Sequence, residues 1–363
     1  YIGAAAFANT GNLKTVTFTA GETPNAEELV FGETLTATGT VDSQKGAFYN
    51  SGITGVVLPS RPISIGAYTF GYCNSLESVT FGGTLTKLGT GAFNYDYALT
   101  AVNGFENTVI TELEDYIFSA GYDAAKTGSL ASITLPETLE RIGKSVFLNQ
   151  SLTSVTIPAS VKYIGQSSFA SNKKLKTFEF AEGSQLEETG IYLFENCSSL
   201  TSLTFPESVK TIGGSFLRGT SVKEFSVPAL VEELANNFFA GAASLEKVTF
   251  PKNTQLKAIR SFTFQNTAIK SIAFPDTEWE LSVEYNDIFS GCAQLKEVYI
   301  GSGVYGVDAA IAACPSINKI TVSKENKYYS TDANGNMLLD LIHHAIKTNT
   351  LLWKEPQRID LCP

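Results

Sequence analysis

Cysteine and histidine are the residues of this sequence with the most distinctive chemistry, and there are few of them. The chain of 363 residues contains five Cys and two His. Cys73, Cys197, Cys292 and Cys314 each follow a Phe or an Ile by three positions. No Cys-x-x-Cys pair and no His at ligand spacing accompanies them, so we expect no metal site. Other copies of the same pattern have Thr, Ser, Ala or Gly at this position, which indicates a packing site for small buried side chains.

The positions of the cysteines, histidines and carboxylates argue against a catalytic site. Cys292 and Cys314 lie in adjacent copies and could reach one another in a disulfide, although buried thiols are the favoured interpretation. His343 and His344 are adjacent, and in a strand their side chains would face opposite ways. The carboxylates are scattered, and no nucleophile elbow, phosphate-binding loop or zinc-protease motif occurs. We therefore expect no catalytic residues and no cofactor.

One glycine-rich segment, Gly301-Ser-Gly303-Val-Tyr-Gly306, has the spacing of a dinucleotide-binding fingerprint. It also falls in register with the repeat described below, where Gly301 replaces Pro158 of an earlier copy. The repeat explains the segment without a nucleotide, and we favour that interpretation.

Composition narrows the classes of protein further. The chain is 43% hydrophobic and 17% charged, which is typical of a folded protein. A net charge of -10 makes nucleic acid and anionic membranes poor partners. No apolar run approaches the roughly 18 residues that span a bilayer. Because residue 1 is Tyr, we expect a trimmed or mature fragment, with any signal peptide or lipid anchor upstream.

A repeat organises most of the chain. A Phe among small residues recurs at a mean interval of about 25 residues, within the range of leucine-rich solenoids. This Phe column consists of Phe7, Phe48, Phe70, Phe93, Phe118, Phe147, Phe169, Phe194, Phe216, Phe239, Phe264 and Phe289, with Ile311 in a thirteenth copy. One copy cannot bury its apolar residues alone, whereas stacked copies share a continuous core.

Each copy also carries three apolar residues spaced as Leu-x-x-Val-x-Phe, as in Leu152-Val155-Ile157. The last two alternate with a polar residue, as in a half-buried strand, and a following Pro such as Pro158 ends the strand. An Ile-Gly step such as Ile164-Gly165 then forms a second turn. The segment from this Gly to the next Leu is short, so we expect a single helical or 3₁₀ turn there. Strands of neighbouring copies should pair in parallel, in one sheet roughly 60 Å long.

The run Ser151-Leu-Thr-Ser-Val-Thr-Ile-Pro158, with Val161-Lys-Tyr-Ile-Gly165 and Ser168-Phe169, resembles the unit of the BspA-type leucine-rich repeat. The resemblance covers about residues 1–323. It implies an α/β-type repeat solenoid: a right-handed leucine-rich-repeat coil with one long parallel β-sheet, short helical or 3₁₀ turns on the other side and an irregular C-terminal cap. Such proteins are typical of gut and oral bacteria and some protists, are commonly secreted or surface-attached, and include adhesins for host matrix proteins. The family has no shared catalytic residues, and its ligands vary.

The repeat predicts two regions and two irregular places. Residues 1–323 should form a solenoid of about 13 copies, the first one truncated. Residues 324–363 should form a C-terminal cap with a hairpin at Asn334-Gly335. Residues 19–40 should hold a long loop or a degenerate extra coil, and residues 119–129 an insertion. Inserted loops cost a solenoid little stability and often carry binding.

The strand residue between the last two apolar positions points out of the sheet and gives a first candidate surface. Thr suits any exposed strand face because it is β-branched. The column also offers a hydroxyl-rich surface able to hydrogen-bond an extended protein or a glycan. From it we select the candidate ligand-binding residues Thr134, Thr156, Glu179, Thr204 and Tyr299.

A group of tyrosines gives a second candidate surface. Tyr72 and Tyr95 both lie two residues after a column Phe in adjacent copies, so they should stand about 4.8 Å apart. Tyr49 and Tyr97 are close in the pattern, and Tyr122 lies in the nearby insertion. Tyr72, Tyr95, Tyr97 and Tyr122 are the candidates, because Tyr combines apolar area with a hydroxyl, which suits glycan or protein binding. The alternative is edge packing between coils.

Together these features predict a non-catalytic extracellular or cell-surface binding protein, which recognises a host or matrix protein through its repeat surface. Three alternatives remain open: a glycan-binding accessory protein, a structural spacer for a functional domain elsewhere, and an enzyme with its catalytic groups in the insertions or in another domain. The expected partner is an extracellular protein or glycan. The sequence does not give the oligomeric state.

Overall fold

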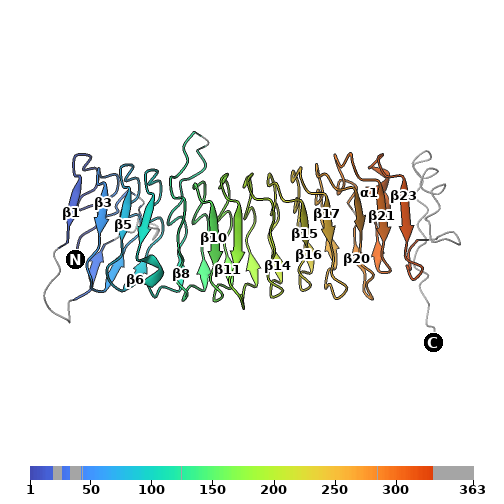
Figure 1. Ribbon diagram of the computed structural model, residues 1–363, viewed down its shortest axis with the longest axis horizontal. Helices are drawn as coiled ribbons and strands as arrows, with labels where there is room; N and C mark the ends of the chain where they lie inside the picture. The colour runs from blue at the N-terminus through green and yellow to red at the C-terminus, as the bar shows by residue number, and fades with distance from the viewer. Residues whose placement is uncertain (19–26, 33–41, 43, 124, 284, 330–363) are drawn as a thin grey trace, which may run out of the picture.

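The computed structural model describes residues 1–18, 27–32, 42, 44–123, 125–283 and 285–329. These residues form an elongated β-solenoid in which each coil contributes one or two short strands (Figure 1). Strands of successive coils pair in parallel and line up in two rows along the molecule. The leucine-rich-type solenoid expected from the repeat is therefore the fold.

The first row contains the strands of the Leu-x-x-Val-x-Phe pattern. In β10 (Ser154–Ile157) the residues alternate, because Val155 and Ile157 face the core while Thr156 faces solvent. Pairing is in register, with Thr156 opposite Glu179. The other strands of this row are β1 (Thr15–Thr17), β3 (Gly55–Val57), β5 (Ser78–Thr80), β7 (Ala101–Asn103), β12 (Thr177–Phe180), β15 (Glu224–Ser226), β17 (Lys247–Thr249), β19 (Ser271–Ala273), β21 (Glu297–Ile300) and β23 (Lys319–Val322).

The second row is formed by the residues that lead into the Ile-Gly step. In β9 (Arg141–Ile142) the Arg is exposed and the Ile is buried, so two residues already make a half-buried strand. Ile142 lies opposite Ile164 of the next coil. The other strands are β2 (Leu29–Phe31), β4 (Ile63–Ile65), β6 (Leu85–Leu88), β8 (Glu112–Leu113), β11 (Tyr163–Ile164), β13 (Glu188–Thr189), β14 (Thr211–Ile212), β16 (Glu233–Leu234), β18 (Ala258–Ile259), β20 (Leu281–Ser282) and β22 (Val304–Tyr305). The expectation of one long sheet is therefore wrong, since each regular coil is paired on two sides.

The segment around the Phe column consists of turns in most coils, and the expected helical turns are not confirmed. Backbone φ is positive two positions before and two positions after the Phe, for example 55° at Ser167 and 61° at Ser171. A right-handed helical turn needs negative φ throughout, so these segments cannot be helical. Helix occurs among the described residues only at η1 (Phe105–Asn107) and at α1 (Asp308–Ala312), where Ile311 replaces the Phe.

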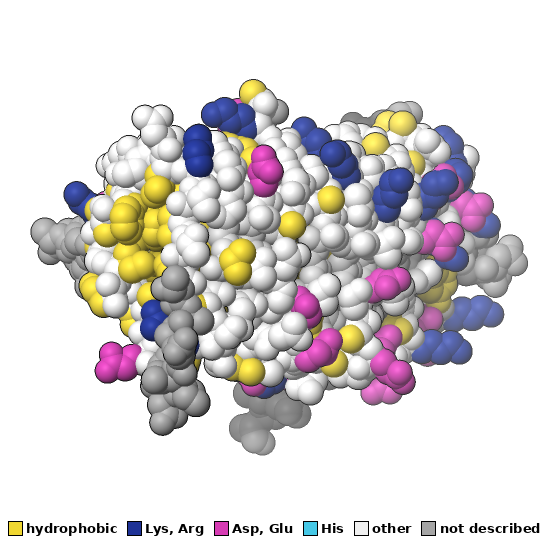
Figure 2. All heavy atoms as spheres, turned by 60° about the vertical axis from the view of Figure 1, so that its left-hand side comes forward, with side chains coloured by type: hydrophobic (Ala, Val, Ile, Leu, Met, Phe, Trp, Pro, Cys, Tyr) yellow, Lys and Arg dark blue, Asp and Glu magenta, His cyan; other side chains and the backbone are white. Residues whose placement is uncertain are grey.

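The Phe column forms the centre of the core as a stack of rings. Ring centroids lie 4.9 Å apart between Phe7 and Phe48 and 5.3 Å apart between Phe147 and Phe169, with nearly parallel planes. Phe147 is fully buried, whereas Phe7 is 41% exposed at the N-terminal end. Figure 2 shows hydrophobic side chains gathered at that end. Stacked aromatic pairs of this kind stabilise beyond the area that they bury.

One coil departs from the repeat. The sequence pattern places Phe216 in the column, but the structure places Leu217 there. The Phe194 N–H donates to the carbonyl of Phe216, and in regular coils the acceptor is the residue that precedes the column position. Phe216 packs beside the stack instead, with its ring centroid 5.2 Å from that of Phe238. Two adjacent apolar residues satisfied the pattern equally, which is why the sequence misplaced this copy.

The coil that contains Phe216 and Leu217 is only weakly joined to the next coil. Residues 201–206 form no strand, so the first row resumes at β15, and the second row stops at β14 and resumes at β16. The backbone bonds that remain include a 3.2 Å bond from Leu217 N to Phe238 O and a 3.3 Å bond from Gly219 N to Gly241 O. We call residues 200–240 the joint. Within the described coils it is the one place where neither row continues.

The column three residues after the Phe holds buried small side chains in most coils, as expected, and it also holds the larger polar residues Asp96, Gln150 and Asn172. Cys197 Sγ lies 3.1 Å from the carbonyl oxygen of Phe169 in the preceding coil, and burial raises the pKa of this thiol to about 12. Cys292 and Cys314 are also buried and free, so no disulfide joins them. The cysteines hold neighbouring coils together as hydrogen-bonding thiols.

The long interval near the N-terminus runs from Phe7 to Phe48, and much of it lies outside the described residues. Its described part contains β2, which pairs in register with β4 of the next coil, and Ile2 bridges to Phe31 on the other side. The residues around β2 thus occupy an ordinary place in the second row. Most of residues 19–40 lies outside the described residues, so the choice between a long loop and an extra coil stays a prediction.

The expected C-terminal cap lies almost wholly outside the described residues, as do Asn334-Gly335, His343 and His344. Residues 324–329 are described and lie against the last coils. The Asn326 side-chain amide donates to the carbonyls of Gly301 and Val304, at 2.6 and 3.1 Å. This contact covers the turn that the sequence offered as a dinucleotide fingerprint.

Candidate binding surface

The outward column of the first row is exposed over most of its length. Thr156 and Glu179 are exposed and lie opposite one another in adjacent coils. Thr134 and Thr204 are exposed as well, but their segments are not in strands. Tyr299 lies far along the molecule in β21 and is partly buried. The structure therefore spreads these five candidates along one face and does not gather them into a single pocket.

Tyr299 already has a partner within the protein. Its hydroxyl donates to the Asp276 carboxylate, with O···O distances of 3.0 and 3.1 Å to the two oxygens. Burial is the main cause of the raised pKa of Tyr299, and the Asp276 carboxylate adds to it. This side chain links two coils, so its hydroxyl is less available to a ligand than the free Thr hydroxyls are.

A groove of about 650 Å³ brings Glu179 and Thr204 together with Lys176. It lies where the first row ends at β12, next to the unpaired residues 201–206. Aromatic residues explain the opening, because β12 carries Phe178 and Phe180 where β10 carries Val and Ile. The ring of Phe180 packs edge-on against that of Phe205, with centroids 5.1 Å apart.

The tyrosines assemble as the sequence predicted. Ring centroids are 5.2 Å apart for Tyr49 and Tyr72, 4.5 Å for Tyr72 and Tyr95, and 6.1 Å for Tyr95 and Tyr97. We call these four residues the tyrosine ladder. All four are partly exposed. The ladder is a continuous aromatic surface backed by the Phe stack. It advances one coil from Tyr49 to Tyr72 and one from Tyr72 to Tyr95, and Tyr97 extends it within the coil of Tyr95.

Backbone conformation makes the choice of Tyr in this ladder unusual. Tyr72 and Tyr95 have φ of 61° and 63°, in the left-handed region. Equivalent positions in other coils hold Asn, as at Asn50 and Asn196. Asn tolerates this region far better than bulky residues do, and a residue with a Cβ pays roughly 1–2 kcal/mol there. Strained residues of this kind concentrate at functional sites.

Two glycines allow the rings to lie flat on the next coil. A Cβ at Gly121 would collide with the ring of Tyr95, and a Cβ at Gly91 would collide with the ring of Tyr68. Tyr68 lies two residues before a column Phe, as does Tyr116, and both are close enough to interact electrostatically. Sequence reasoning missed these two tyrosines because it followed only the positions after the Phe.

Three hydroxyls of the ladder, those of Tyr49, Tyr72 and Tyr97, are neutral at physiological pH. Burial raises the pKa of Tyr72 to about 12, and the neighbouring Tyr95 and Tyr49 add to the shift. The pKa of Tyr49 and that of Tyr97 are also raised, chiefly by burial. The hydroxyls therefore remain protonated and can both donate and accept hydrogen bonds, on top of apolar rings.

The insertion at residues 119–129 projects from the row of coils (Figure 1), and it contacts the ladder through Lys126. Lys126 places its Nζ 5.2 Å from the centre of the Tyr97 ring, a cation–π contact. Tyr122 is 64% exposed, so it stands free on the insertion rather than in the ladder. The structure thus groups Tyr72, Tyr95 and Tyr97 and sets Tyr122 on the adjoining loop.

Asn149 holds the insertion in place. Its Nδ2 donates to the carbonyls of Gly121, Asp123 and Lys126, at 3.0, 3.3 and 2.7 Å. The residue is buried and has φ of 57°, which Gly also adopts without strain. The sequence gives no motif for this role, because Asn also occupies the equivalent position in coils that carry no insertion.

We expect Asn149→Gly to release the insertion without disturbing the coil. Three carbonyls lose their donor, so the local structure should lose about 1–3 kcal/mol. Amide hydrogen exchange should become faster in residues 119–129. The matched control is Asn196→Gly, because Asn196 has the same conformation (φ 60°) but is exposed. Equal effects of the two substitutions would contradict the anchoring role.

Features of other classes of site are not assembled in the described residues. No group of three or more His, Cys, Asp or Glu is placed to hold a metal ion there. Nor does any described helix have the length and apolar character to cross a membrane. The glycine-rich turn is explained by packing, since a Cβ at Gly301 or Gly303 would collide with the backbone of the preceding coil.

Comparison with known proteins identifies the repeat. The model of the BspA type leucine rich repeat region, of six copies, matches residues 41–124, 121–244 and 215–339. No curated protein sequence matches the chain. Among solved structures, a leucine-rich repeat protein from Bacteroides ovatus ATCC 8483 is 19% identical, with a TM-score of 0.36, over 85% of this chain and 98% of that one.

Two further solved structures are similar over most of their length. The pneumococcal vaccine antigen PcpA is 19% identical, with a TM-score of 0.33, over 85% of this chain and 74% of that one. A leucine-rich repeat protein from Eubacterium ventriosum ATCC 27560 is 16% identical, with a TM-score of 0.40, over 78% and 87%. The family model covers well over half of the chain, so the protein belongs to the BspA type leucine rich repeat family.

Proposed function

We propose that this protein is a non-catalytic binding protein, located outside the cell or on its surface, that recognises a host or matrix protein through its repeat surface. The tyrosine ladder is the observation that carries the proposal. It is a row of partly exposed aromatic rings, two of them in a backbone conformation that disfavours Tyr. Folding alone does not call for Tyr at these positions, because Asn occupies them in other coils.

Protein recognition suits this surface for physical reasons. Tyrosines are enriched in protein interfaces because a rigid ring supplies contact area at low entropic cost. The ladder is rigid before binding, since it is fixed to stacked coils, and pre-organisation lowers the cost of association. The cation Lys126 at one end adds a charged contact beside the rings. The exposed Thr column favours a glycan as the second candidate ligand, because sugar hydroxyls pair well with side-chain hydroxyls.

The first test is a binding screen against immobilised matrix proteins and a glycan array, followed by a ladder variant. We expect Tyr72→Asn combined with Tyr95→Asn to weaken binding to the selected ligand by about tenfold or more, as for loss of interface aromatics. Asn is preferred to Ala because it fits the left-handed conformation. The variant should therefore fold as the wild type does, which thermal unfolding verifies.

The control is another stacked tyrosine pair far from the ladder. Tyr305 and Tyr328 have ring centroids 5.4 Å apart, and Tyr305→Ala with Tyr328→Ala should leave binding unchanged. A saturable matrix-protein ligand that depends on the ladder supports the proposal. Binding to glycans alone would replace it with the glycan-binding alternative. Binding that is equal in wild type and ladder variant would remove the ladder from the interface.

A further inference from the structure

Lysines gather along one edge of this acidic protein. This edge is formed by the turns that precede the first-row strands, up to and including the residue directly before each strand. Six lysines of the C-terminal half define what we call the lysine edge: Lys173, Lys174, Lys176, Lys223, Lys270 and Lys296. Figure 2 shows Lys and Arg side chains in a line along the upper edge, with acidic side chains lower on the same view.

The repeat places these lysines above one another. Lys223, Lys270 and Lys296 each stand directly before a strand of the first row, as does Lys176. The Lys296 N–H donates to the carbonyl of Lys270, at 2.9 Å, so the two backbones are one coil apart. Successive positions on this edge are therefore spaced by about 4.8 Å per coil. In the earlier coils only Lys14 carries a positive charge at the corresponding position.

Most of the lysine edge has no anionic partner in the protein. All six lysines of the edge are exposed. Among the described residues, no carboxylate lies within ion-pair distance of five of them. Lys270 alone pairs, with Glu246 at 2.6 Å. Positive charges that stand together without compensation repel one another, so the arrangement costs stability unless a partner supplies negative charge.

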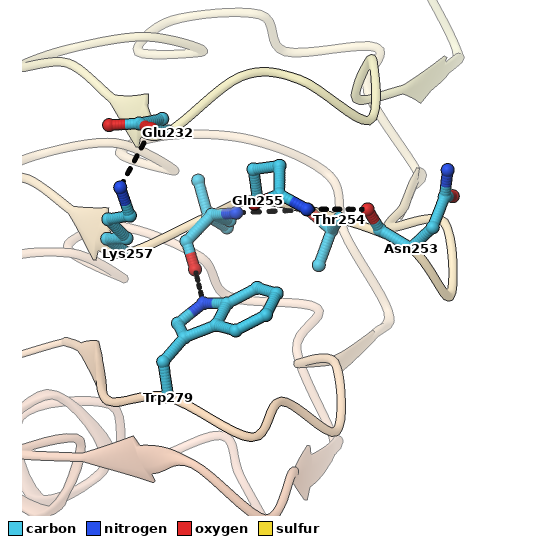
Figure 3. Close-up of polar contacts among 7 residues, drawn as sticks. Glu232, Asn253, Thr254, Gln255, Lys257 and Trp279 are labelled. Carbon is cyan, nitrogen blue, oxygen red and sulfur yellow. Dashed lines mark hydrogen bonds and ion pairs between the residues drawn. The ribbon is translucent and has the colours of Figure 1, made fainter.

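Several lysines elsewhere on the solenoid form an ion pair with a neighbouring coil. Lys162, Lys210 and Lys257 pair with a glutamate of the preceding coil, at 3.0, 3.0 and 2.7 Å. Figure 3 shows the Lys257–Glu232 pair, together with Trp279, whose indole N–H donates to the carbonyl of Leu256. Ion pairs between neighbouring coils are thus common in this fold, and on the lysine edge only Lys270 forms one among the described residues, with Glu246.

We propose that the lysine edge binds a polyanionic polysaccharide, a sulfated or carboxylated sugar chain that lies along the solenoid axis. This is a second surface, and it does not depend on the proposed role of the tyrosine ladder. The cations recur at multiples of the coil spacing, with Thr201 between Lys176 and Lys223 and with Glu246 between Lys223 and Lys270. A row of this kind can follow the repeated charge of such a chain. Between the lysines stand hydroxyl groups such as those of Thr177, Thr201 and Ser221, which can hydrogen-bond sugars.

The composition of the edge favours a sugar over other polyanions. Single-stranded nucleic acid binds with bases stacked on aromatic side chains, and the turns and strand entries that carry these lysines expose no aromatic residue. Acidic protein segments usually add buried aromatic or aliphatic anchors to their charges, and the apolar residues of this edge, such as Leu175 and Leu295, are buried in the core. Charge and hydroxyl groups alone are what a sulfated sugar requires.

Heparin is the probe for the test, with desulfated heparin, which keeps only its carboxylates, as a counterpart of lower charge. We expect saturable binding of heparin to the whole chain, with an affinity that falls steeply as salt is raised from 50 to 200 mM, as for other polyanions. Lys173→Gln, Lys174→Gln and Lys176→Gln together should lower the affinity by about tenfold or more. They should also make the salt slope shallower by about two to three units.

The control is the triple variant Lys162→Gln, Lys210→Gln and Lys257→Gln, which changes the net charge equally and removes paired lysines. It should keep at least half of the wild-type affinity. An equal loss in both triple variants would show a general charge effect and overturn the proposal. So would the absence of heparin binding, or tighter binding of a single-stranded oligonucleotide or a polyglutamate peptide. Loss of tyrosine-dependent binding would leave this result unchanged, so the two proposals fail separately.

Discussion

Replacing Phe147 with Ala should lower the free energy of unfolding of the central coils by about 3–5 kcal/mol. The ring is fully buried and stacks between Phe118 and Phe169, with centroid distances of 5.7 and 5.3 Å. Its removal forfeits the transfer energy and leaves a cavity that two strand-paired coils cannot close. Because a coil contacts only its neighbours, the loss should be local.

Amide hydrogen exchange measured along the chain tests both the size and the place of this effect. Protection should fall in the coils around Phe147 and stay unchanged in the coil of Phe289. Phe147→Leu should cost much less, because Leu217 occupies the column naturally. Phe7→Ala should also cost less, since that ring is 41% exposed. Uniform loss of protection along the whole chain would contradict the nearest-neighbour view.

Replacing Asp96 with Asn should stabilise the protein, by about 1–3 kcal/mol at pH 7. Asp96 occupies the buried column three residues after Phe93, and its Oδ1 accepts a 2.8 Å hydrogen bond from the Cys73 N–H. Its Oδ2 is buried without a partner. In the same column Asn172 donates through Nδ2 to the carbonyl of Phe147, at 2.8 Å. An Asn at 96 keeps the acceptor and replaces the unpartnered oxygen with a donor.

The effect should depend on pH in a defined direction. Burial raises the pKa of Asp96 well above its ordinary value of 3.8, although the Cys73 N–H opposes the shift. Unfolding therefore releases a proton between the unfolded and folded pKa values, and stability falls as the pH rises through that window. The variant should lack this slope, so its advantage should grow from pH 4 upward.

Thermal unfolding of both proteins between pH 4 and pH 8 measures the difference. Glu182→Gln is the control, because Glu182 is exposed and its removal changes the net charge equally. That variant should follow the wild-type pH profile. An Asp96→Asn protein that is less stable than wild type at pH 7, or one that keeps the slope, would show that the carboxylate is stabilised by its surroundings.

Much of the fold followed from spacing alone. The Phe column and the strand pattern are set by burial, which repeats once per coil, and this is why the register of pairs such as Thr156 and Glu179 was predictable. The second row was missed because its strands have only two residues in most coils, too few to show alternation. The turns were predicted as helical because a short apolar segment is compatible with either a helix or a turn. In the sequence, positive φ is indicated only by scattered Asn, Gly and Ser residues.

The parts of the binding surface that follow the repeat could be predicted, and the parts that depart from the repeat could not. Tyr72 and Tyr95 share one position in adjacent copies, so their proximity could be inferred. The contact of Lys126 with Tyr97 depends on the path of an insertion that has no counterpart in other coils. The lysine edge was hidden by the net charge, because a negative total conceals a local excess of positive charge.

The joint at residues 200–240 gives the molecule an uneven stiffness. A solenoid behaves as a beam whose resistance to bending comes from backbone hydrogen bonds on opposite sides of its cross-section. At the joint neither row continues, so the two halves are joined by isolated backbone hydrogen bonds, such as that from Leu217 N to Phe238 O, and by aromatic packing. Non-directional contacts of this kind tolerate small rotations that a strand ladder resists. Under shear the two halves should therefore pivot about this point, so that surfaces on either side can adjust their relative angle while each half stays straight.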